Sequence, residues 1–558
     1  MWLTNIIDAF RRPGGWRGPA VAALFAAFAG LPGLLALPPL DRDEARFAQA
    51  TAQMLEQDDY VVIRFQDQPR FKKPVGIHWM QAAAVSAFGE AGHRDIRLYR
   101  LPSLLGAMLA AAACVWGAAG FFSRSRALLS GLLLGGGLLL STEAFIAKTD
   151  AMLTGLTVLA MAAFGRLYAE ARGGPPAGRF TVWLLWFSLA LAVLVKGPIA
   201  LLVAGLAALA LRLADRRPLT LRPVQWRWGL LVFAAIVGPW AWAVTVATDG
   251  AFWSVAIGGD LAPKLAGGHE SHGAPPGMHA LAVPLLIFPA TLLLPAAVWI
   301  AWNRRSDPGI RFALAWLIPA WIVFEATPTK LPHYVLPCYA ALAWLCAAGL
   351  SGAGGPVVRR AGAALHGLAG VVLAAASLYL AATFGDPGDA PAAGLTALLF
   401  VLAGAAGALL LLRREAPRAV LWSLCTGVLA HAALTGLLAP SLQPLLLSER
   451  TARVLSEARL LPAQGVISGP VAVAGYAEPS LVFLVGSDTG LGDAADAARA
   501  LASGRAAVVE SREQPAFRTA LAQEGVTPRE VGRVSGLNYS NGDDTELTVY
   551  APPREARP

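Results

Sequence analysis

Long apolar runs separated by short polar segments dominate the first 440 residues of this chain. Runs long enough to cross about 30 Å of hydrocarbon occur about thirteen times, near 19–37, 99–119, 126–141, 150–169, 181–195, 197–213, 229–247, 279–301, 311–326, 332–350, 361–382, 390–412 and 418–440. Within 181–213, Lys196-Gly197-Pro198 marks either a break between two short helices or a kink inside one. The pattern predicts a mostly α-helical, polytopic membrane protein.

The pattern changes after Pro440, where short apolar stretches alternate with polar ones. Their length and periodicity are those of the strands and helices of a soluble domain. The predicted strands are Val466–Val473, Ser480–Val485 and Ala506–Glu510, and the predicted helices are Ala494–Leu501 and Pro515–Glu524. The chain therefore divides into a transmembrane domain, 1–440, and a small α/β domain, 441–558, with 551–558 as a loose tail.

The distribution of charged residues supports this division and predicts the orientation of the chain in the membrane. Hydrophobic residues make up 56% of the chain and charged residues 15%, and the net charge of +9 comes from arginines spread over short loops, which excludes a nucleic-acid-binding stripe. Arginines mark every second loop, at 124/126, 166/172/179, 212/216/217/222/227, 304/305/311, 359/360 and 413/414/418. The positive-inside rule then predicts a cytoplasmic N-terminus, with Met1–Arg17 as a retained signal anchor, and an extracytoplasmic C-terminal domain.

The first outer loop, 38–98, is the longest polar segment between spans. It begins with the acids Asp41, Asp43 and Glu44, continues as an amphipathic helix, and reaches two adjacent lysines, Lys72 and Lys73. Residues 75–88 are apolar but too short to span, so we expect them in the interface, anchored by Trp79. A second outer loop, 248–278, is rich in Gly, Pro and His. Long structured loops on one face are typical of functional sites.

Lysine is scarce, and its positions are uneven. The six lysines all fall on the predicted outer loops or at the outer ends of spans: Lys72, Lys73, Lys148, Lys196, Lys264 and Lys330. A single lysine at a helix end often only places its ammonium group in the interface. Six on the arginine-poor face favour a common anionic ligand, since lysine is a compact point charge for phosphate.

Two further groups of residues are candidates for chemistry. Asp150 lies at the outer mouth of a span, where a carboxylate indicates function, although Thr149-Asp150 also fits a helix N-cap. A histidine-rich segment offers His269, His272 and His279 with Glu270 as ligands for a divalent metal, but H-x-x-H in a Gly/Pro-rich loop is a weak signal. We expect no cofactor, with this metal as the alternative.

Five motifs occur in order along the chain: D-E-x-R-F-A at Asp43–Ala48, F-x-K-P at Phe71–Pro74, T-D at Thr149-Asp150, K-G at Lys196-Gly197 and K-L-P-x-Y-x-L-P at Lys330–Pro337. Together they resemble the aminoarabinose (lipid A) transferase and protein O-mannosyltransferase group of the GT-C superfamily of membrane glycosyltransferases. The resemblance covers the transmembrane half throughout. It implies a GT-C-like catalytic domain over 1–440 that includes the loops 38–98 and 248–278.

The resemblance implies functional aspartates at Asp43 and Asp150 and phosphate contacts at Lys73 and Lys264. The other expected site residues come from the charges and polar side chains gathered on the arginine-poor face. The catalytic carboxylates are expected to be Asp43, Asp150 and Glu44. The cations for the donor phosphate are expected to be Lys73, Lys264, Lys72, Lys196 and Lys330, and the substrate-binding residues Arg46, His269, Glu270, His272, His333 and Tyr334. The chain departs from the pattern at Lys72, where the aminoarabinose transferases typically have glutamate, and at Phe47, which replaces a tyrosine.

The implied function is that of an inverting glycosyltransferase that moves a sugar from a polyprenyl-phosphate donor to a periplasmic acceptor, either lipid A or another glycolipid or glycan. The alternatives are a protein O-mannosyltransferase-like enzyme and a flippase or transporter of lipid-linked sugars. A transporter favours inverted repeats and polar residues at mid-membrane depth, whereas the charges here gather at one face. We expect a monomer in the bacterial cytoplasmic (inner) membrane that binds no nucleic acid.

Overall fold

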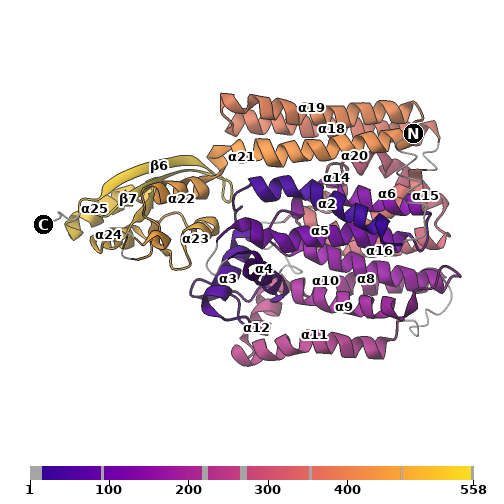
Figure 1. Ribbon diagram of the computed structural model, residues 1–558, viewed down its shortest axis with the longest axis horizontal. Helices are drawn as coiled ribbons and strands as arrows, with labels where there is room; N and C mark the ends of the chain where they lie inside the picture. The colour runs from indigo at the N-terminus through magenta and orange to yellow at the C-terminus, as the bar shows by residue number, and fades with distance from the viewer. Residues whose placement is uncertain are drawn as a thin grey trace.

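The computed structural model describes residues 15–89, 94–215, 224–263, 273–350, 355–465, 467 and 469–553. Long helices lie side by side in one bundle, and a small domain formed by the C-terminal residues sits beyond one end of it (Figure 1). The helices α3 (Asp43–Gln57) and α4 (Gly76–Phe88) lie at that same end of the bundle. The predicted mostly α-helical membrane protein with a separate C-terminal α/β region is confirmed.

Among the described residues, nine helices are long and apolar enough to cross a membrane. They are α2 Arg17–Ala36, α5 Ile96–Ala118, α8 Asp150–Glu170, α9 Gly178–Lys196, α11 Trp226–Ala247, α16 Pro308–Ala326, α18 Pro356–Phe384, α19 Ala390–Leu412 and α20 Ala416–Ala433, the last two counted with adjoining helical turns. A tenth span results if α14 (Met278–Leu286) and the segment Ala290–Asn303, which includes α15 (Leu294–Asn303), are joined across their 115° bend.

Several predicted spans are shorter helices in the structure. These are α6 Arg124–Gly135 with α7 Leu138–Glu143, α10 Ile199–Asp215, and α17 Tyr339–Gly349, which follows a 3₁₀ helix at Pro332–Cys338. Two further short helices are α12 Ala251–Trp253, in the predicted loop 248–278, and α21 Ala439–Ser441, at the end of the predicted span 418–440. Each of the thirteen predicted segments coincides with helix, but the number that crosses a membrane stays a prediction. The sequence at Lys196 is a break between two helices, because Gly197 has a φ of +71°, which glycine adopts without strain.

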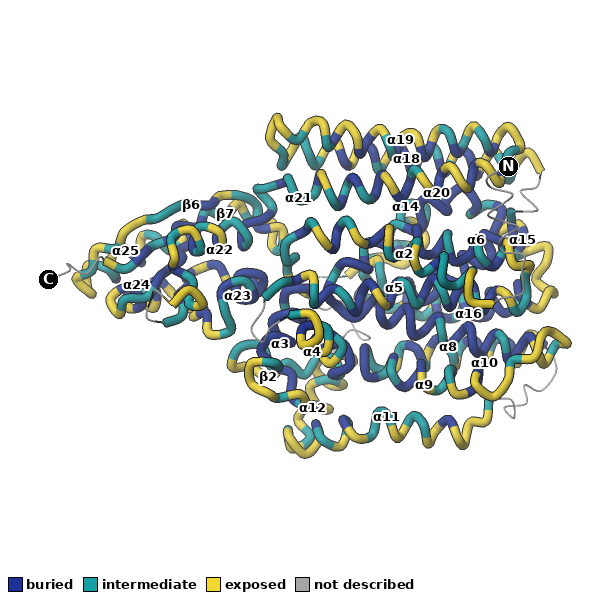
Figure 2. The backbone as a smooth tube through the Cα atoms, viewed as in Figure 1, coloured by how far each residue is buried: buried dark blue, intermediate teal, exposed yellow. Residues whose placement is uncertain are grey.

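The bundle has a buried centre and an exposed periphery (Figure 2), and many of the exposed side chains are large and hydrophobic. In α8, 89% of an apolar stretch of 18 residues is buried inside the protein, whereas in α11 only 11% of such a stretch is buried. Helices α5 and α8 pack closely where Gly106 faces Gly155, since a methyl group on either residue would meet the backbone of the other helix. This close packing fixes the first residue of α8, Asp150, beside the outer part of α5.

The C-terminal domain is built on a five-stranded sheet with the order β4-β3-β5-β7-β6. Its strands are β3 Ala472–Ala474, β4 Gly490–Gly492, β5 Ala507–Glu510, β6 Arg529–Asn538 and β7 Asp543–Ala551, and its helices are α22 Leu447–Glu457, α23 Pro479–Val485, α24 Ala494–Ala502 and α25 Gln514–Glu524. Strand β3 pairs in parallel with β4 and β5, while β7 pairs antiparallel with β5 and β6. A two-stranded ribbon, β1 Arg64–Phe65 and β2 Gln68–Pro69, lies in the first outer loop.

Three expectations for this domain differ from the structure. Among the described residues of the predicted strand Val466–Val473, only Ala472 and Val473 lie in a strand, β3. The segment Ser480–Val485 is helix α23 and not a strand, because Pro479 occupies the first helical turn and a short, uniformly buried run does not distinguish a strand from a helix. The predicted tail 551–558 was wrong at its first residue, since Ala551 ends β7 and pairs with Arg529. The predicted helices over 494–501 and 515–524 and the predicted strand over 506–510 are confirmed.

The domain docks on the first outer loop through the turn that precedes α3. The carboxylate of Asp41 accepts a hydrogen bond from the backbone N–H of Ser480 at 3.0 Å. Burial raises the pKa of Asp41 to about 6; the hydrogen bond from Ser480 and the charge of Arg42 act against this rise, and the nearby carboxylate of Glu478 adds to it. Tyr539 also lies against Asp41, whose backbone N–H donates to the tyrosine hydroxyl.

This pKa predicts a pH-dependent stability. An ordinary aspartate titrates near 3.8, so between that pH and about 6 the folded protein binds a proton that the unfolded chain has lost, and stability falls as the pH rises. We expect Asp41→Asn to match the wild type near pH 4 and to exceed it above pH 6 by up to about 3 kcal/mol. Melting curves of the detergent-solubilised proteins across this range would check this. A difference between the two that does not change with pH would contradict the assignment.

Candidate functional site

Ionisable side chains from distant segments meet at the end of the bundle that lies beside the C-terminal domain. Asp150 begins α8, Lys196 ends α9, and His333 lies in the 3₁₀ helix Pro332–Cys338. Lys148 precedes α8 in the turn after α7, and Glu143 is the last residue of α7. We call these five residues the outer charge cluster.

Asp150 lies between the two lysines of this cluster. Its Oδ1 is hydrogen-bonded to the Nζ of Lys196, and its Oδ2 is 3.8 Å from the Nζ of Lys148. The helix N-cap is Thr149, and no side-chain cap hydrogen bond forms there, so capping does not account for the Asp150 side chain. The position of its carboxylate at a helix N-terminus, between two ammonium groups, stabilises the negative charge.

Glu143 and His333 complete the cluster. The Nζ of Lys148 is 3.1 Å from Glu143 Oε1 and 3.4 Å from His333 Nδ1, and His333 Nε2 is 3.7 Å from Asp150 Oδ1. The other oxygen of Glu143 is buried and has no hydrogen-bond partner in the described part of the chain. Sequence reasoning missed Glu143. The signal was available, because a lone acid in the apolar run LLLSTEAF is costly in a membrane protein.

Two predicted substrate-binding residues also reach this region. Tyr334 follows His333, and the Nζ of Lys196 lies 5.5 Å from the centre of its ring, within the range of a cation–π contact. The structure therefore brings together Asp150, Lys196, His333 and Tyr334, which are far apart along the chain.

Asp43 approaches the same cluster from α3. Its side chain is exposed at the first residue of the helix. Burial alone would lower the pKa of Lys148, but the carboxylates of Glu143 and Asp150, with a smaller contribution from Asp43, raise it above its usual value. Asp43 is thus close enough to act electrostatically on the cluster while its own carboxylate stays accessible.

Glu44, the next residue, has a different environment. It is buried, and its two oxygens accept hydrogen bonds from Nε and Nη2 of Arg100 at 2.9 and 2.8 Å. They also accept from the backbone N–H groups of Ala147 and Leu40 at 2.7 and 2.8 Å. These four bonds use the lone pairs of the carboxylate. This geometry argues against the expected catalytic role of Glu44 and makes it the link between α3, α5 and the turn before α8.

The ammonium group of Lys330 is also hydrogen-bonded within the protein. Its side chain is buried, and its Nζ donates to the carbonyl oxygens of Ala274 and Thr327 at 2.9 and 2.7 Å. Its neighbour Thr329 pairs with Gly273. These contacts argue against the expected phosphate-binding role of Lys330, which instead fastens the chain after the second outer loop to the bundle.

The remaining predicted residues are placed less specifically. Lys72 and Lys73 are half-buried between β2 and α4, and Arg46 is half-buried in α3. Lys264, His269, Glu270 and His272 lie outside the described residues. Their suggested partner His279 is buried, with Nδ1 2.7 Å from Glu325 Oε2 and Nε2 3.0 Å from the carbonyl oxygen of Leu331, so neither nitrogen is available to a metal. In the described ranges, no three His, Cys, Asp or Glu side chains are grouped to hold a metal ion.

Comparisons with known proteins place these features in context. Residues 71–254 match the family described as dolichyl-phosphate-mannose-protein mannosyltransferase. A relative from Aeromonas salmonicida (strain A449), an undecaprenyl phosphate-alpha-4-amino-4-deoxy-L-arabinose arabinosyl transferase, is 30% identical over 71% of this chain and 74% of its own length. A relative of the same description from Enterobacter sp. (strain 638) is 30% identical over 55% of this chain, and the match spans 54% of that protein.

A solved structure shows the same fold. The crystal structure of ArnT from Cupriavidus metallidurans bound to undecaprenyl phosphate superposes with a TM-score of 0.75 at 18% sequence identity, covering 96% of this chain and 98% of that chain. The agreement extends over both the helical bundle and the C-terminal domain, because almost the whole of each chain is covered. The expected GT-C-like architecture is therefore confirmed.

The buried pair of Glu44 and Arg100 predicts a large loss of stability when one partner is removed. We expect Arg100→Met to lower the free energy of unfolding by about 3–5 kcal/mol, because it leaves a buried carboxylate without its cation. Arg97→Met is the matched control on the same helix. Arg97 forms a surface pair with Asp95 and its side chain is 55% exposed, so its loss should change stability by less than about 1 kcal/mol. Thermal unfolding in detergent would separate the two, and equal effects would contradict the assignment.

Proposed function

Because this chain belongs to the family of undecaprenyl phosphate-alpha-4-amino-4-deoxy-L-arabinose arabinosyl transferases, which are membrane glycosyltransferases, we propose that it moves a sugar from a polyprenyl-phosphate donor to an acceptor on the outer face of the bacterial cytoplasmic membrane. The observation that carries the proposal is the outer charge cluster, with two lysines around Asp150 and the exposed carboxylate of Asp43 beside them. The N-terminus is then cytoplasmic, the C-terminal domain is extracytoplasmic, and the protein acts as a monomer.

The lysines serve the departure of the lipid phosphate. A sugar attached to a lipid monophosphate leaves slowly unless the charge that develops on the phosphate is stabilised. Lys73 from the first outer loop and Lys196 from the cluster are the proposed donors, with Lys72 and Lys264 as further cations of the outer loops. Each well-placed cation stabilises the transition state by about 3 kcal/mol. Glu143 and Asp150 keep Lys148 charged and hold the ammonium groups in place before the donor arrives.

Asp43 is the proposed base. Its carboxylate is exposed, whereas Asp150 is bound by Lys196 and Glu44 by Arg100. Asp43 accepts the proton of an acceptor hydroxyl, or orients that hydroxyl, while it attacks the anomeric carbon from the side opposite the phosphate, which inverts the configuration. If the acceptor is itself a phosphate, as in lipid A, deprotonation is easy and Asp43 mainly positions the acceptor.

The names of the relatives favour 4-amino-4-deoxy-L-arabinose as the sugar and undecaprenyl phosphate as the carrier. The proposed acceptor is lipid A or another glycolipid or glycan. The match of residues 71–254 to the mannosyltransferase family favours a protein acceptor as the second candidate. Mass spectrometry of the glycolipids of the native host, with and without the gene, would identify both the sugar and the acceptor.

The experiment that tests the proposed function measures release of free polyprenyl phosphate from a labelled lipid-linked sugar by the purified protein in detergent with acceptor present. A transferase must release the carrier when the sugar leaves it. A flippase moves the intact lipid and releases none, so the absence of release with every acceptor tested would overturn the proposal.

Loss of either reacting group should stop transfer. We expect Asp43→Asn and Lys73→Ala each to reduce turnover by at least about 100-fold. Asp43→Asn removes the proton acceptor, and Lys73→Ala removes a cation that stabilises the leaving phosphate. Asp58→Asn is the matched control, since Asp58 follows the other end of α3, about 20 Å from Asp43 along the helix. It should retain wild-type turnover. Near-normal turnover of either active-site variant, at equal yield of folded protein, would remove that residue from the mechanism.

A second comparison tests the outer charge cluster. Lys196→Met should lower kcat by about 100-fold or more, because it removes one cation and leaves Asp150 with weaker compensation. Arg179→Met makes the same change of charge at the opposite, exposed end of α9, and it should leave kcat unchanged. The two variants are compared by steady-state kinetics on folded protein, and equal kcat values for both would exclude the cluster from the transfer step.

A further inference from the structure

Two turns of the C-terminal domain lie against the residues that lead into α3. The segments are Tyr476–Ser480, which ends in the first turn of α23, and Asn538–Gly542, which joins β6 to β7. In the structure both reach back to Asp41 and Arg42, more than 400 residues earlier in the chain. Asp43, the proposed base, is the next residue after this contact.

Glu478 is the centre of the contact. Its side chain is buried, and its Oε1 and Oε2 accept hydrogen bonds from Nη2 and Nε of Arg42, both at 3.3 Å. The Nδ2 of Asn538 donates to the same Oε1 at 2.9 Å. Glu478 precedes helix α23 but makes no cap hydrogen bond to it. The carboxylate therefore serves the docking of Arg42 and not the local helix.

Asp41 is held on two sides. Its backbone N–H donates to the hydroxyl of Tyr539 at 2.7 Å, and its carboxylate accepts from the backbone N–H of Ser480. On the other side of Asp43, Glu44 is bound to Arg100 of the bundle. The C-terminal domain thus fixes the two residues before Asp43, and the membrane domain fixes the residue after it.

We propose that Glu478 and Tyr539 are positioning residues for transfer: by clamping Asp41 and Arg42, the C-terminal domain sets the place of the Asp43 carboxylate at the outer charge cluster. This inference rests on the proposed function. The domain contributes no reacting group, yet the rate of the chemical step depends on its docking.

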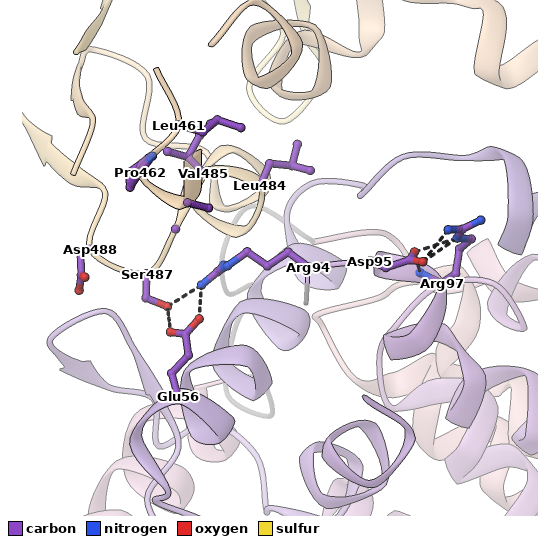
Figure 3. A pocket seen from close by; sticks show the side chains of 12 residues that line it. Glu56, Arg94, Asp95, Arg97, Leu461, Pro462, Leu484, Val485, Ser487 and Asp488 are labelled. Atoms are coloured by element: carbon purple, nitrogen blue, oxygen red, sulfur yellow. Dashed lines mark hydrogen bonds and ion pairs between the residues drawn. The ribbon is translucent and has the colours of Figure 1, made fainter. Parts of the chain in front are cut away.

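A second contact between the same two parts supplies a control. Arg94 donates hydrogen bonds to Glu56 near the end of α3 and to the hydroxyl of Ser487 in the loop after α23, beside a cavity of about 690 Å³ (Figure 3). Glu56 is thirteen residues beyond Asp43 on the same helix, about 20 Å away. Weakening this contact loosens the docking of the C-terminal domain but leaves the contacts of Asp41 and Arg42 in place.

The kinetic experiment compares Glu478→Gln and Tyr539→Phe with Ser487→Ala in the full-length protein, using release of polyprenyl phosphate. A displaced catalytic group lowers the rate of the chemical step more than substrate binding. We expect kcat to fall about 10- to 100-fold in the first two variants with the KM for the donor within about twofold of wild type, and less than about a twofold change in Ser487→Ala. Similar kcat values in the wild type and the three variants, or a change in KM alone, would overturn the proposal.

A double-variant comparison distinguishes positioning from a general loss of structure. Arg42→Gln and Glu478→Gln remove the two partners of one contact, so the double variant should be no slower than the slower single variant. If the effects on kcat instead multiply, Arg42 and Glu478 act independently and the clamp is excluded. Equal melting temperatures of the single and double variants would show that the comparison concerns folded protein.

Hydrogen–deuterium exchange provides a readout that does not depend on activity. We expect faster exchange of the peptide containing residues 40–46 in Glu478→Gln, with unchanged exchange in α8 and α9, and wild-type exchange of that peptide in Ser487→Ala. Unchanged exchange of 40–46 in Glu478→Gln would overturn the clamp whatever the enzyme transfers. If the wild type releases no polyprenyl phosphate, the proposed function fails, while the exchange result still decides whether Glu478 holds this turn.

Discussion

The buried ion pair of Glu44 and Arg100 is the constraint on which the outer part of the molecule depends. Two charges inside a protein lose much of their hydration, and the loss is offset only when every donor and acceptor finds a partner. Here the carboxylate takes two backbone N–H groups besides the guanidinium, and Arg100 also donates to the carbonyl oxygens of Leu37 and Pro38. The pair thereby joins the end of α2, the start of α3 and the turn before α8, and this brings Asp43 and Asp150 to one place.

In the outer charge cluster, contacts between opposite charges stabilise ionisable side chains that lie close together. Opposite charges alternate, so that Lys148 faces Glu143 and Asp150, and Lys196 faces Asp150. Alternation places each ammonium group beside a carboxylate, which offsets part of its loss of hydration. In the proposed mechanism, the phosphate of the donor meets cations whose positions are already fixed, which reduces the reorganisation needed during the reaction.

The C-terminal domain gives the same loop a second support. Most of its core is formed by its own residues. Glu478 and Tyr539 contact the residues that lead into α3, and the hydroxyl of Ser487 donates a hydrogen bond to Glu56 near the other end of that helix. A helix held at both ends by one domain, and through Glu44 by the other, is restrained as a rigid element. The agreement with a solved structure over almost the full length of both chains extends to this domain, which places it within the shared fold.

Local patterns were enough to predict several parts of the protein. Apolar runs of membrane length predicted the helices because burying a hydrogen-bonded apolar helix is the stable solution in lipid whatever the partners are. The scarcity of lysine and the lone acid at Asp150 predicted which face carries the charges. The family motifs then pointed to Lys196, His333 and Tyr334, which meet at the cluster, and to Asp43, which approaches it.

Other features depend on contacts that no local pattern contains. Asp43 and Glu44 are adjacent and chemically alike, yet successive residues point about 100° apart around a helix, and only the presence of Arg100, 56 residues later, makes one a buried link and leaves the other exposed. Lys330 resembles the other lysines in sequence but finds backbone carbonyls. Sequence by itself determined which segments form long apolar helices and where charge accumulates, because those follow from each residue's own hydration. Only the tertiary structure decided which charges are neutralised and which remain available, because that depends on the partner each one meets.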